Sequence, residues 1–398
     1  MPFRETCSME ERVRMLAEYD TGAFTVSTLA ARYGVSRKTF YMWLERRASG
    51  DRRWFEDRSH IPWICPQKTE ADVVAAIVAM RQRFVHFGPK KIQARLVRNH
   101  PAVVWPAAST IGDILKREGL IKSCQRRRRR ADPIGVIAPP ELAANAEWCA
   151  DFKGWFRTLD GQRCDPLTVT DAASRYLIDT RIVEPTSAGV RTAFERVFAD
   201  NGLPLAIRSD NGSPFGSPGA SGLSRLSVWW LRLGIEPHYI RPASPQENGR
   251  HERMHRVLKE ETSTPPAESA AEQQARFDAF RRHYNEERPH EALAQTPPAA
   301  HWQPSARPFV ARLEDPWYDA NHEVRRVRPD GTIKWRGESV FIGEALTREL
   351  IGLEELEKGG HMVRFCRREL GILDRGHRFV RFAPPYVKLG KTEEAKDE

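Results

Sequence analysis

Apolar residues recur at helical spacing in two stretches near the start of the chain. In the first stretch, Ser8 and Glu11 have the spacing of a capping box, which predicts a helix that ends near Gly22. The second stretch shows helical spacing in three segments, residues 72–84, 88–99 and 109–118. Two small all-α domains are therefore expected, over residues 1–60 and 66–123.

Residues 25–47 have the pattern of a helix-turn-helix motif. Gly34 suits the turn, and Ser36 suits the N-cap of a second helix. The apolar side chains of that helix are expected to face inward: Phe40, Trp43 and Leu44. A recognition helix reads bases with its first residues, so the candidate DNA contacts are Arg37, Lys38 and Thr39. A three-helix interaction domain that does not touch DNA is the alternative.

From residue 145 the pattern changes to strands and then to alternating helices and strands. Strands are expected at residues 148–156, 167–170, 176–183, 205–208 and 238–240. Helices are expected at residues 187–201, 223–233, 248–259 and 272–284. Three strands in succession followed by alternation predict a mixed α/β layer domain over residues 145–300.

Prolines between residues 297 and 308 mark a linker, and short alternating segments follow it. Strands are expected at residues 322–328, 332–336, 339–342, 361–366 and 378–382, joined by turns such as Asp330-Gly331. This pattern predicts a small SH3-like β-barrel over residues 310–387. The charged residues 388–398 are expected to be a disordered tail.

The charge of the chain indicates a polyanionic partner. The chain has 398 residues, a net charge of +10 and a pI near 9.4, which favours nucleic acid over the weaker alternative of a membrane surface. Lys90 and Lys91 add basic charge to the second helical domain. The run Arg126, Arg127, Arg128, Arg129, Arg130 lies in a basic linker, residues 124–144, and is expected to become ordered on phosphates. A nuclear address signal is the competing interpretation of this run.

Localisation follows from what the sequence lacks. It contains no run of eighteen apolar residues, and its N-terminus has no apolar signal core. The six cysteines lie far apart without a C-x-x-C pair, so ordinary reduced thiols are expected. We therefore expect a cytoplasmic protein that associates with the nucleoid and has no membrane partner.

Three acids stand at the ends of predicted elements in the central domain: Asp151 on the first strand, Asp210 after the strand 205–208, and Glu252 on the helix that begins near residue 248. Carboxylates from separate elements can converge on two divalent cations about 3.5–4 Å apart that promote phosphoryl transfer. Mg²⁺ suits such all-oxygen ligation.

Basic side chains accompany the third acid. On an ideal helix Glu252 shares a face with three groups suited to phosphate: His255, Arg256 and Lys259. A solvated helix face with ion pairs is the alternative for this segment.

Four motifs in this region resemble the catalytic core of bacterial insertion-sequence transposases, which belong to the retroviral-integrase superfamily. They read D-F-K-G, S-D-N-G-S-P-F, P-x-S-P-Q-x-N-G-R-x-E-R-M-H-R-x-L-K and Y-N-x-E-R-P-H-E-A-L. The resemblance implies a ribonuclease-H-like core and an Asp-Asp-Glu triad formed by Asp151, Asp210 and Glu252. It also implies Mg²⁺ or Mn²⁺, with two ions. Lys259 matches a lysine that contacts DNA near the site, and Arg253 and His255 are expected to lie near phosphate.

The chain departs from this family in two ways. The interval between Asp210 and Glu252 is longer than usual, and the excess fits a surface loop at residues 216–222. The helix-turn-helix stands where retroviral integrases have a His/Cys zinc module. Among the other acids, Asp171 is interpreted as a turn residue, Glu247 as a loop residue, and Asp165 and Asp179 as exposed.

Together these features predict a DNA transposase. It would bind double-stranded DNA at the terminal repeats of a mobile element, act as a homo-oligomer on that DNA, and catalyse 3′-end cleavage and strand transfer into target DNA. Two alternatives remain, an inactive transposase-derived DNA-binding regulator and a nuclease without strand transfer.

Overall fold

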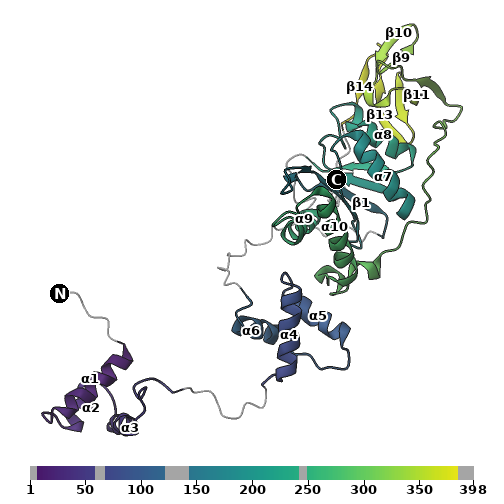
Figure 1. Cartoon of the computed structure of the whole chain (residues 1–398). Helices are drawn as coiled ribbons and strands as arrows, with labels where there is room; N and C mark the ends of the chain where they lie inside the picture. Colours follow the sequence, from purple (N-terminus) through teal and green to yellow (C-terminus); the bar gives the residue numbers. More distant parts are fainter. Residues whose placement is uncertain (1–6, 59–67, 122–142, 242–248, 384–398) are drawn as a thin grey trace, which may run out of the picture. The chain divides into compact units, whose positions relative to one another are not determined.

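The computed structural model describes residues 7–58, 68–121, 143–241 and 249–383. It divides into two compact units, residues 1–70 and residues 71–398, whose elements are labelled in Figure 1. The first unit contains the helices α1 (Ser8–Asp20), α2 (Val26–Arg32) and α3 (Arg37–Ala48). Within the described ranges, no helix combines the length and the apolar character needed to cross a membrane.

The helices of the first unit pack around Leu16, Leu29 and Phe40, which are all fully buried. Gly34 has a φ of +64° at the turn between α2 and α3, a conformation that glycine adopts without strain. Ser36 caps α3, since its side chain accepts a hydrogen bond from the Thr39 N–H. The predicted two-helix pattern is therefore confirmed.

The predicted capping box of α1 is wrong. Ser8 is the first helical residue, and Cys7 occupies the N-cap without a side-chain hydrogen bond to the helix. A serine inside the first turn no longer has the extended backbone that aims its hydroxyl at the free N–H groups.

The second unit begins with three helices, α4 (Ala71–Arg83), α5 (Pro89–Asn99) and α6 (Ala108–Arg117). They enclose an apolar core centred on Ile77, Ile92 and Ile111, none of which is accessible to solvent. All three predicted helical segments are present.

A five-stranded mixed sheet forms the centre of the second unit, with the strand order β5-β4-β1-β6-β7. Its strands are β1 (Glu147–Phe152), β4 (Pro166–Asp171), β5 (Leu177–Ile182), β6 (Ala206–Ser209) and β7 (Glu236–Tyr239). Strands β5, β4 and β1 are antiparallel, whereas β1, β6 and β7 run parallel. The predicted mixed α/β core is confirmed.

Helices cover both faces of this sheet. Side chains such as Trp148 and Val169 pack against α7 (Ser187–Asn201) and α8 (Arg225–Arg232). On the other face, Leu177 packs with Met254 of α9 (Gly249–Thr262) and with Phe277 of α10 (Ala270–Arg282). Because neighbouring residues of a strand point to opposite faces, the polar Thr168 and Thr170 face α9.

The single long strand expected at residues 148–156 is in fact two. Strand β1 ends at Phe152, and residues 156–157 form β2, which pairs with β3 (Arg163–Cys164) in a small hairpin. Gly154 has a φ of +92° at the break, which an extended strand cannot accommodate. Apolar residues on both sides of the glycine concealed this break in the sequence.

The C-terminal region forms two sheets. The larger has the order β14-β13-β12-β11-β8, and the smaller pairs β10 with β9. The bounds are β8 (His322–Arg326), β9 (Thr332–Trp335), β10 (Glu338–Phe341), β11 (Leu350–Glu355), β12 (His361–Phe365), β13 (Arg368–Leu373) and β14 (Phe379–Arg381). Within the described residues these strands do not close, because β14 and β8 remain the edges of the larger sheet. The small β-domain is present, but the closed SH3-like barrel is not seen.

Two of these strands, β11 and β13, were not predicted. Each contains a glycine, Gly352 or Gly371, and glycine weakens a strand pattern. A side chain at Gly371 would collide with the carbonyl oxygen of Val380 on β14. The glycines therefore mark close contacts with neighbouring groups, which no local pattern reveals.

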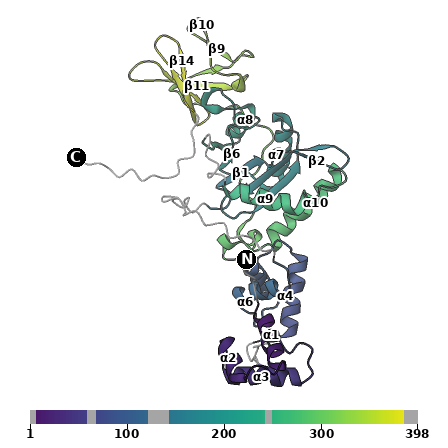
Figure 2. The same cartoon turned by 90° about the vertical axis from the view of Figure 1, so that its left-hand side faces the viewer.

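The β-domain packs on the central domain through a shared apolar cluster (Figure 2). Leu223 together with Val228 and Leu231 of α8 joins the cluster formed by the C-terminal strands. The residues 216–222, expected as a surface loop, include a short 3-10 helix, Ala220–Gly222, whose residues are buried. The Ser221 N–H donates to the Phe382 carbonyl at 3.3 Å. This segment is therefore part of the interface.

Candidate active site

Asp151 and Asp210 lie at the same edge of the central sheet. Strands β1 and β6 are parallel neighbours, and Cys149 pairs with Arg208 in their register. Each acid follows its member of this pair by two residues. Adjacent strands are about 4.8 Å apart, so the two carboxylates leave neighbouring strands at the same level.

The environment of Asp210 differs from that of an ordinary surface acid. The residue as a whole is exposed, yet nearby protein atoms displace water from its carboxyl group and raise its pKa. The Gly212 N–H, 3.3 Å from Oδ1, partly opposes this shift. A cation next to the carboxyl would restore the preference for the charged form.

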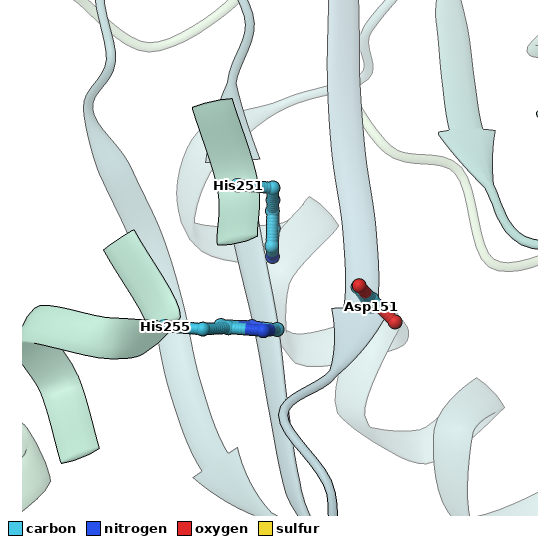
Figure 3. A group of neighbouring side chains, drawn as sticks. All are labelled: Asp151, His251 and His255. Carbon is cyan, nitrogen blue, oxygen red and sulfur yellow. The ribbon is translucent and has the colours of Figure 1, made fainter. Parts of the chain in front are cut away.

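The third predicted acid, Glu252, is exposed in the first turn of α9. Two histidines on the same helix, His251 and His255, hold this turn against the sheet (Figure 3). The Thr168 hydroxyl lies 2.6 Å from His251 Nε2 and 2.7 Å from His255 Nε2. Thr170 Oγ1 lies 3.0 Å from His251 Nδ1. The position of Glu252 is thus set by its two neighbours.

Both histidines remain neutral. Burial lowers the pKa of His251 well below its ordinary value, and burial together with Lys153 lowers the pKa of His255 to about 4. His255 would therefore approach a phosphate as a neutral imidazole, which can still exchange hydrogen bonds. Its predicted contact with DNA stays a prediction.

Asp151, His251 and His255 also bring possible metal-ligand atoms together, all within 4.8 Å of one another. Both ring nitrogens of His251, however, already have threonine hydroxyls as partners. Metal binding by His251 would have to break one of these buried hydrogen bonds. The carboxylates of Asp151 and Asp210 are the better donors for a hard divalent cation, which prefers oxygen.

Sequence reasoning assigned no role to Lys153, although it lies within the D-F-K-G motif. Burial and the neighbouring Lys259 lower its pKa to about 8. Lys259 itself is exposed on α9. Lys153 and Lys259 therefore lie close to each other, an arrangement suited to a phosphate.

The DNA-contact candidates of the first unit are at the start of α3. Arg37 and Lys38 are exposed there, whereas Thr39 is half-buried. The Thr39 hydroxyl lies 2.8 Å from the Ser36 hydroxyl, so it takes part in the helix cap. The two basic side chains are free to reach a groove.

The remaining basic residues that were predicted to contact DNA differ in their surroundings. Lys90 forms an ion pair with Glu291 at 2.7 Å, while Lys91 and Arg253 line a cavity beside the acids. The arginines 126–130 lie outside the described residues. No contact of any of these residues with DNA is tested by the structure.

The other acids of the central domain differ in burial and in their hydrogen-bond partners. Asp171 is 1% exposed, and its carboxylate accepts hydrogen bonds from the Ser174 N–H and hydroxyl, as expected of a turn residue. Asp179 was expected to be exposed but is buried beside Arg181 at 3.4 Å and Arg196 at 3.5 Å. Asp165 is half-buried. Glu247 lies outside the described residues.

Comparison with protein families identifies this region. Two family models, both described as integrase core domain, match residues 141–245 and residues 233–298. The matched residues include β1, β6 and α9, the elements that carry the three acids.

Two insertion-element proteins are similar to the chain. An uncharacterized 39.2 kDa protein of IS476 from Xanthomonas euvesicatoria is 28% identical over 230 residues, which cover 56% of this chain and 63% of that protein. An uncharacterized 31.7 kDa protein of IS407 from Burkholderia multivorans is 27% identical over 244 residues, covering 58% of this chain and 80% of that protein. The chain thus spans less than two thirds of the first relative.

Solved integrase structures also show a likeness. The HTLV-2 integrase catalytic core domain in complex with magnesium has a TM-score of 0.32 at 16% identity, covering 40% of this chain and 99% of that one. A chain of the simian T-cell lymphotropic virus intasome in complex with the PP2A regulatory subunit B56 gamma has a TM-score of 0.36 at 16% identity, covering 72% of this chain and 91% of that one. The family matches thus identify residues 141–298 as similar to integrase core domains, and the relatives found are insertion-element proteins.

Proposed function

We propose that the protein is a DNA transposase that cleaves the 3′ ends of a mobile element and joins them to target DNA. The observation that carries this proposal is the placement of Asp151 and Asp210 at equivalent positions on the parallel neighbours β1 and β6. Glu252, in the first turn of α9, would complete the acidic set. The matches to integrase core domains and to insertion-element proteins support the same activity.

Asp151, Asp210 and Glu252 would hold Mg²⁺ or Mn²⁺, and we propose two ions. The donor chemistry supports this, because all three offer carboxylate oxygens and the first two leave adjacent strands. Within the described residues, Asp151 groups at metal-ligand distance with His251 and His255, so Asp210 and Glu252 would have to move closer when an ion binds. Bound divalent cations supply Lewis-acid activation of the attacking oxygen and stabilise the leaving oxygen. Lys153 and Lys259 would hold phosphates of the strand that reacts.

The two reactions are the same displacement at phosphorus with different nucleophiles. In cleavage, a water oxygen loses a proton and forms a bond to phosphorus, the bond to the 3′ oxygen breaks, and the 3′ oxygen takes up a proton. In strand transfer, that 3′-hydroxyl loses its proton as it attacks a target phosphodiester, and a target 3′ oxygen leaves and takes up a proton. The number of phosphodiester bonds is unchanged in the second step.

The other parts of the chain would bind DNA. We assign end recognition to residues 1–60, through Arg37, Lys38 and Thr39, and supporting contacts to residues 66–123. Residues 124–144 would follow the phosphate backbone, and the β-domain, residues 310–387, would complete an assembly of several copies on DNA. The net charge of +10 supports a nucleic-acid partner.

One assay separates this function from its alternatives. Wild-type protein is mixed with duplex DNA that carries the element ends, Mg²⁺ and a supercoiled target plasmid, and the products are separated on a gel. Joined products support a transposase, cleavage alone indicates a nuclease, and DNA binding without products indicates a regulator.

The matched variants are Asp151→Asn and Glu252→Gln, with Glu260→Gln on the same helix as the control. The first two should abolish cleavage and leave DNA binding nearly unchanged, since each removes a ligand oxygen without adding bulk. Cleavage by Glu252→Gln at the wild-type rate would transfer the role to Glu247.

A further inference from the structure

A basic cavity adjoins the candidate active site. It has a volume of about 230 Å³, far more than the roughly 10–15 Å³ that one water requires. Six cationic side chains line it, and we call them the arginine pocket: Lys91, Arg175, Arg208, Arg250, Arg253 and Arg288. They come from five different parts of the fold, which the tertiary structure brings together.

The pocket lies next to the acids but is separate from the proposed metal ligands. Its wall includes Cys149, two residues before Asp151 on β1, and the residues Arg250 and Arg253 that flank Glu252 on α9. A group bound in the pocket would therefore be a neighbour of a group bound at the acids.

The local backbone directs Arg175 into this cavity. The residue follows β4 at a turn, with a φ of +64° that is uncommon for a residue other than glycine. The Asp171 carbonyl accepts from the Arg175 N–H at 3.1 Å, and the Asp171 side chain binds Ser174. The turn is thus held rigidly, and strained positions of this kind concentrate at functional sites.

Among the residues that the structure describes, the carboxylates near the pocket do not balance its charge. Arg208 is paired with Glu147 at 3.2 Å, and Arg288 with Glu261 at 2.7 Å. Glu291 at the rim is exposed and paired with Lys90. The carboxylate of Asp171, the remaining acid in the wall, accepts hydrogen bonds from Ser174 within the same turn. Among these described residues, therefore, only two of the six pocket cations form an ion pair with a carboxylate, and the other four do not.

Burial and neighbouring cations lower the pKa values of two groups that line the pocket. Burial and the nearby Arg288 lower the pKa of Lys91 to about 8. Burial and then Lys91, Arg288 and Arg175 lower the pKa of His290, which also lines the cavity, to about 3. Like charges held together in this way disfavour the empty pocket, and an anion would relieve the repulsion.

A buried donor also faces this region without a partner. Within the described residues, the Arg175 Nε atom is shielded from solvent and makes no hydrogen bond. A buried donor left unsatisfied costs about 1–3 kcal/mol. Guanidinium groups match the geometry of phosphate oxygens, which they bind in pairs.

We propose that the arginine pocket binds a phosphate group, namely a backbone phosphodiester of the DNA strand adjacent to the one held at the acids. This assignment rests on the proposed function as a DNA-processing enzyme. The pocket would position the strand, since phosphate contacts fix register without reading sequence.

The test measures DNA binding in EDTA, so that metal-dependent chemistry does not contribute. Fluorescence anisotropy with a labelled duplex is recorded over a range of NaCl concentrations for wild type, Arg175→Gln and Arg253→Gln. The control is Arg282→Gln, an exposed arginine of α10 away from the pocket. Loss of one phosphate contact should reduce the slope of log affinity against log salt by about one, with no change in the control.

Two additions make the outcome decisive. Arg175→Lys keeps the charge but loses the planar fork, so it should recover part of the slope. Inorganic phosphate is added to each protein in thermal melts, which also show whether each variant is folded. Because Arg253 is exposed, Arg253→Gln provides a test even if replacement of Arg175 prevents folding.

Wild-type slopes in both glutamine variants would overturn the proposal. If phosphate alone then stabilised wild type but not the variants, the pocket would bind a free anion instead of DNA. Absence of cleavage by the wild-type protein would count against the transposase function only, because the slopes are measured without metal. A reduced slope in a protein that does not cleave DNA would still establish the pocket.

Discussion

Two carboxylates on adjacent strand ends repel each other unless a cation lies between them. Asp151 and Asp210 leave adjacent strands at the same level, and burial raises the pKa of Asp210. At the scale of single residues, this arrangement supports the proposed binding of a divalent cation.

Lys259 is expected to hold a phosphate beside this site. It lies two turns after Glu252, a rise of about 10.5 Å on an ideal helix, so it reaches a neighbouring nucleotide and not the metal site itself. Lys259→Ala should weaken DNA binding, slow strand transfer and lower the salt slope by about one. Lys259→Arg should retain part of both properties.

Salt titrations and single-turnover joining assays check this expectation. If Lys259→Ala matches wild type in slope and in joining rate, the lysine is a solvated surface residue. The strand would then follow another face of α9.

Because folding lowers the pKa of the two histidines of α9, the stability of the protein is expected to depend on pH. In the folded chain the pKa of His255 is about 4, below the unfolded value of about 6.5. Between these values the unfolded chain binds more protons, so stability should fall as the pH falls from 6.5 to 4. Urea denaturation of wild type and His255→Gln at several pH values measures this slope.

His255→Gln should have a shallower pH dependence than wild type. Part of the dependence should persist, because His251 and His290 also have a lowered pKa. Identical pH slopes in the two proteins would show that His255 is not shielded as described.

At the scale of elements, one threonine of β4 contacts two histidines of α9. Thr168 is fully buried and contacts both His251 and His255 through its hydroxyl. Its register partner on β5, Thr180, is equally buried, but within the described residues its hydroxyl has no hydrogen-bond partner. Replacement of threonine by valine is therefore expected to change the stability of the protein in opposite directions at these two paired positions.

Thr168→Val should destabilise the protein by about 1–3 kcal/mol, because it leaves buried imidazole nitrogens unsatisfied. Thr180→Val, the matched control, should be neutral or stabilising, since it removes a buried polar group that makes no bond. Urea denaturation measures both. Equal losses in the two variants would mean that the Thr168 hydroxyl does not anchor α9.

At the scale of the whole molecule, the two compact units suggest a division of labour. Deletion of residues 1–60 should abolish the sequence-specific footprint on element ends, because the exposed Arg37 and Lys38 are removed with α3. Weak, salt-sensitive binding should persist through the remaining basic residues. DNase footprinting and salt titration of the truncated protein check both points.

A footprint that survives this deletion would assign recognition to residues 66–123 instead. The second unit carries its own cores, so it should fold without the first.

Local patterns were sufficient for much of the fold. Helices such as α3 follow from apolar spacing and from the Ser36 cap, both of which depend on residues within one or two turns. The candidate acids were also found from the sequence, because each lies in a short motif next to a predicted element. Such patterns report only interactions between residues that are close together in the sequence.

Only the tertiary structure decided the rest. Gly352 and Gly371 hid two strands, because the contacts that require them come from other strands and loops. The Thr168 anchor joins residues more than eighty positions apart, and the arginine pocket draws on five separate segments. Side chains so distant in the chain meet only after the sheet has ordered its strands, so their shared burial and charge cannot be read from local spacing.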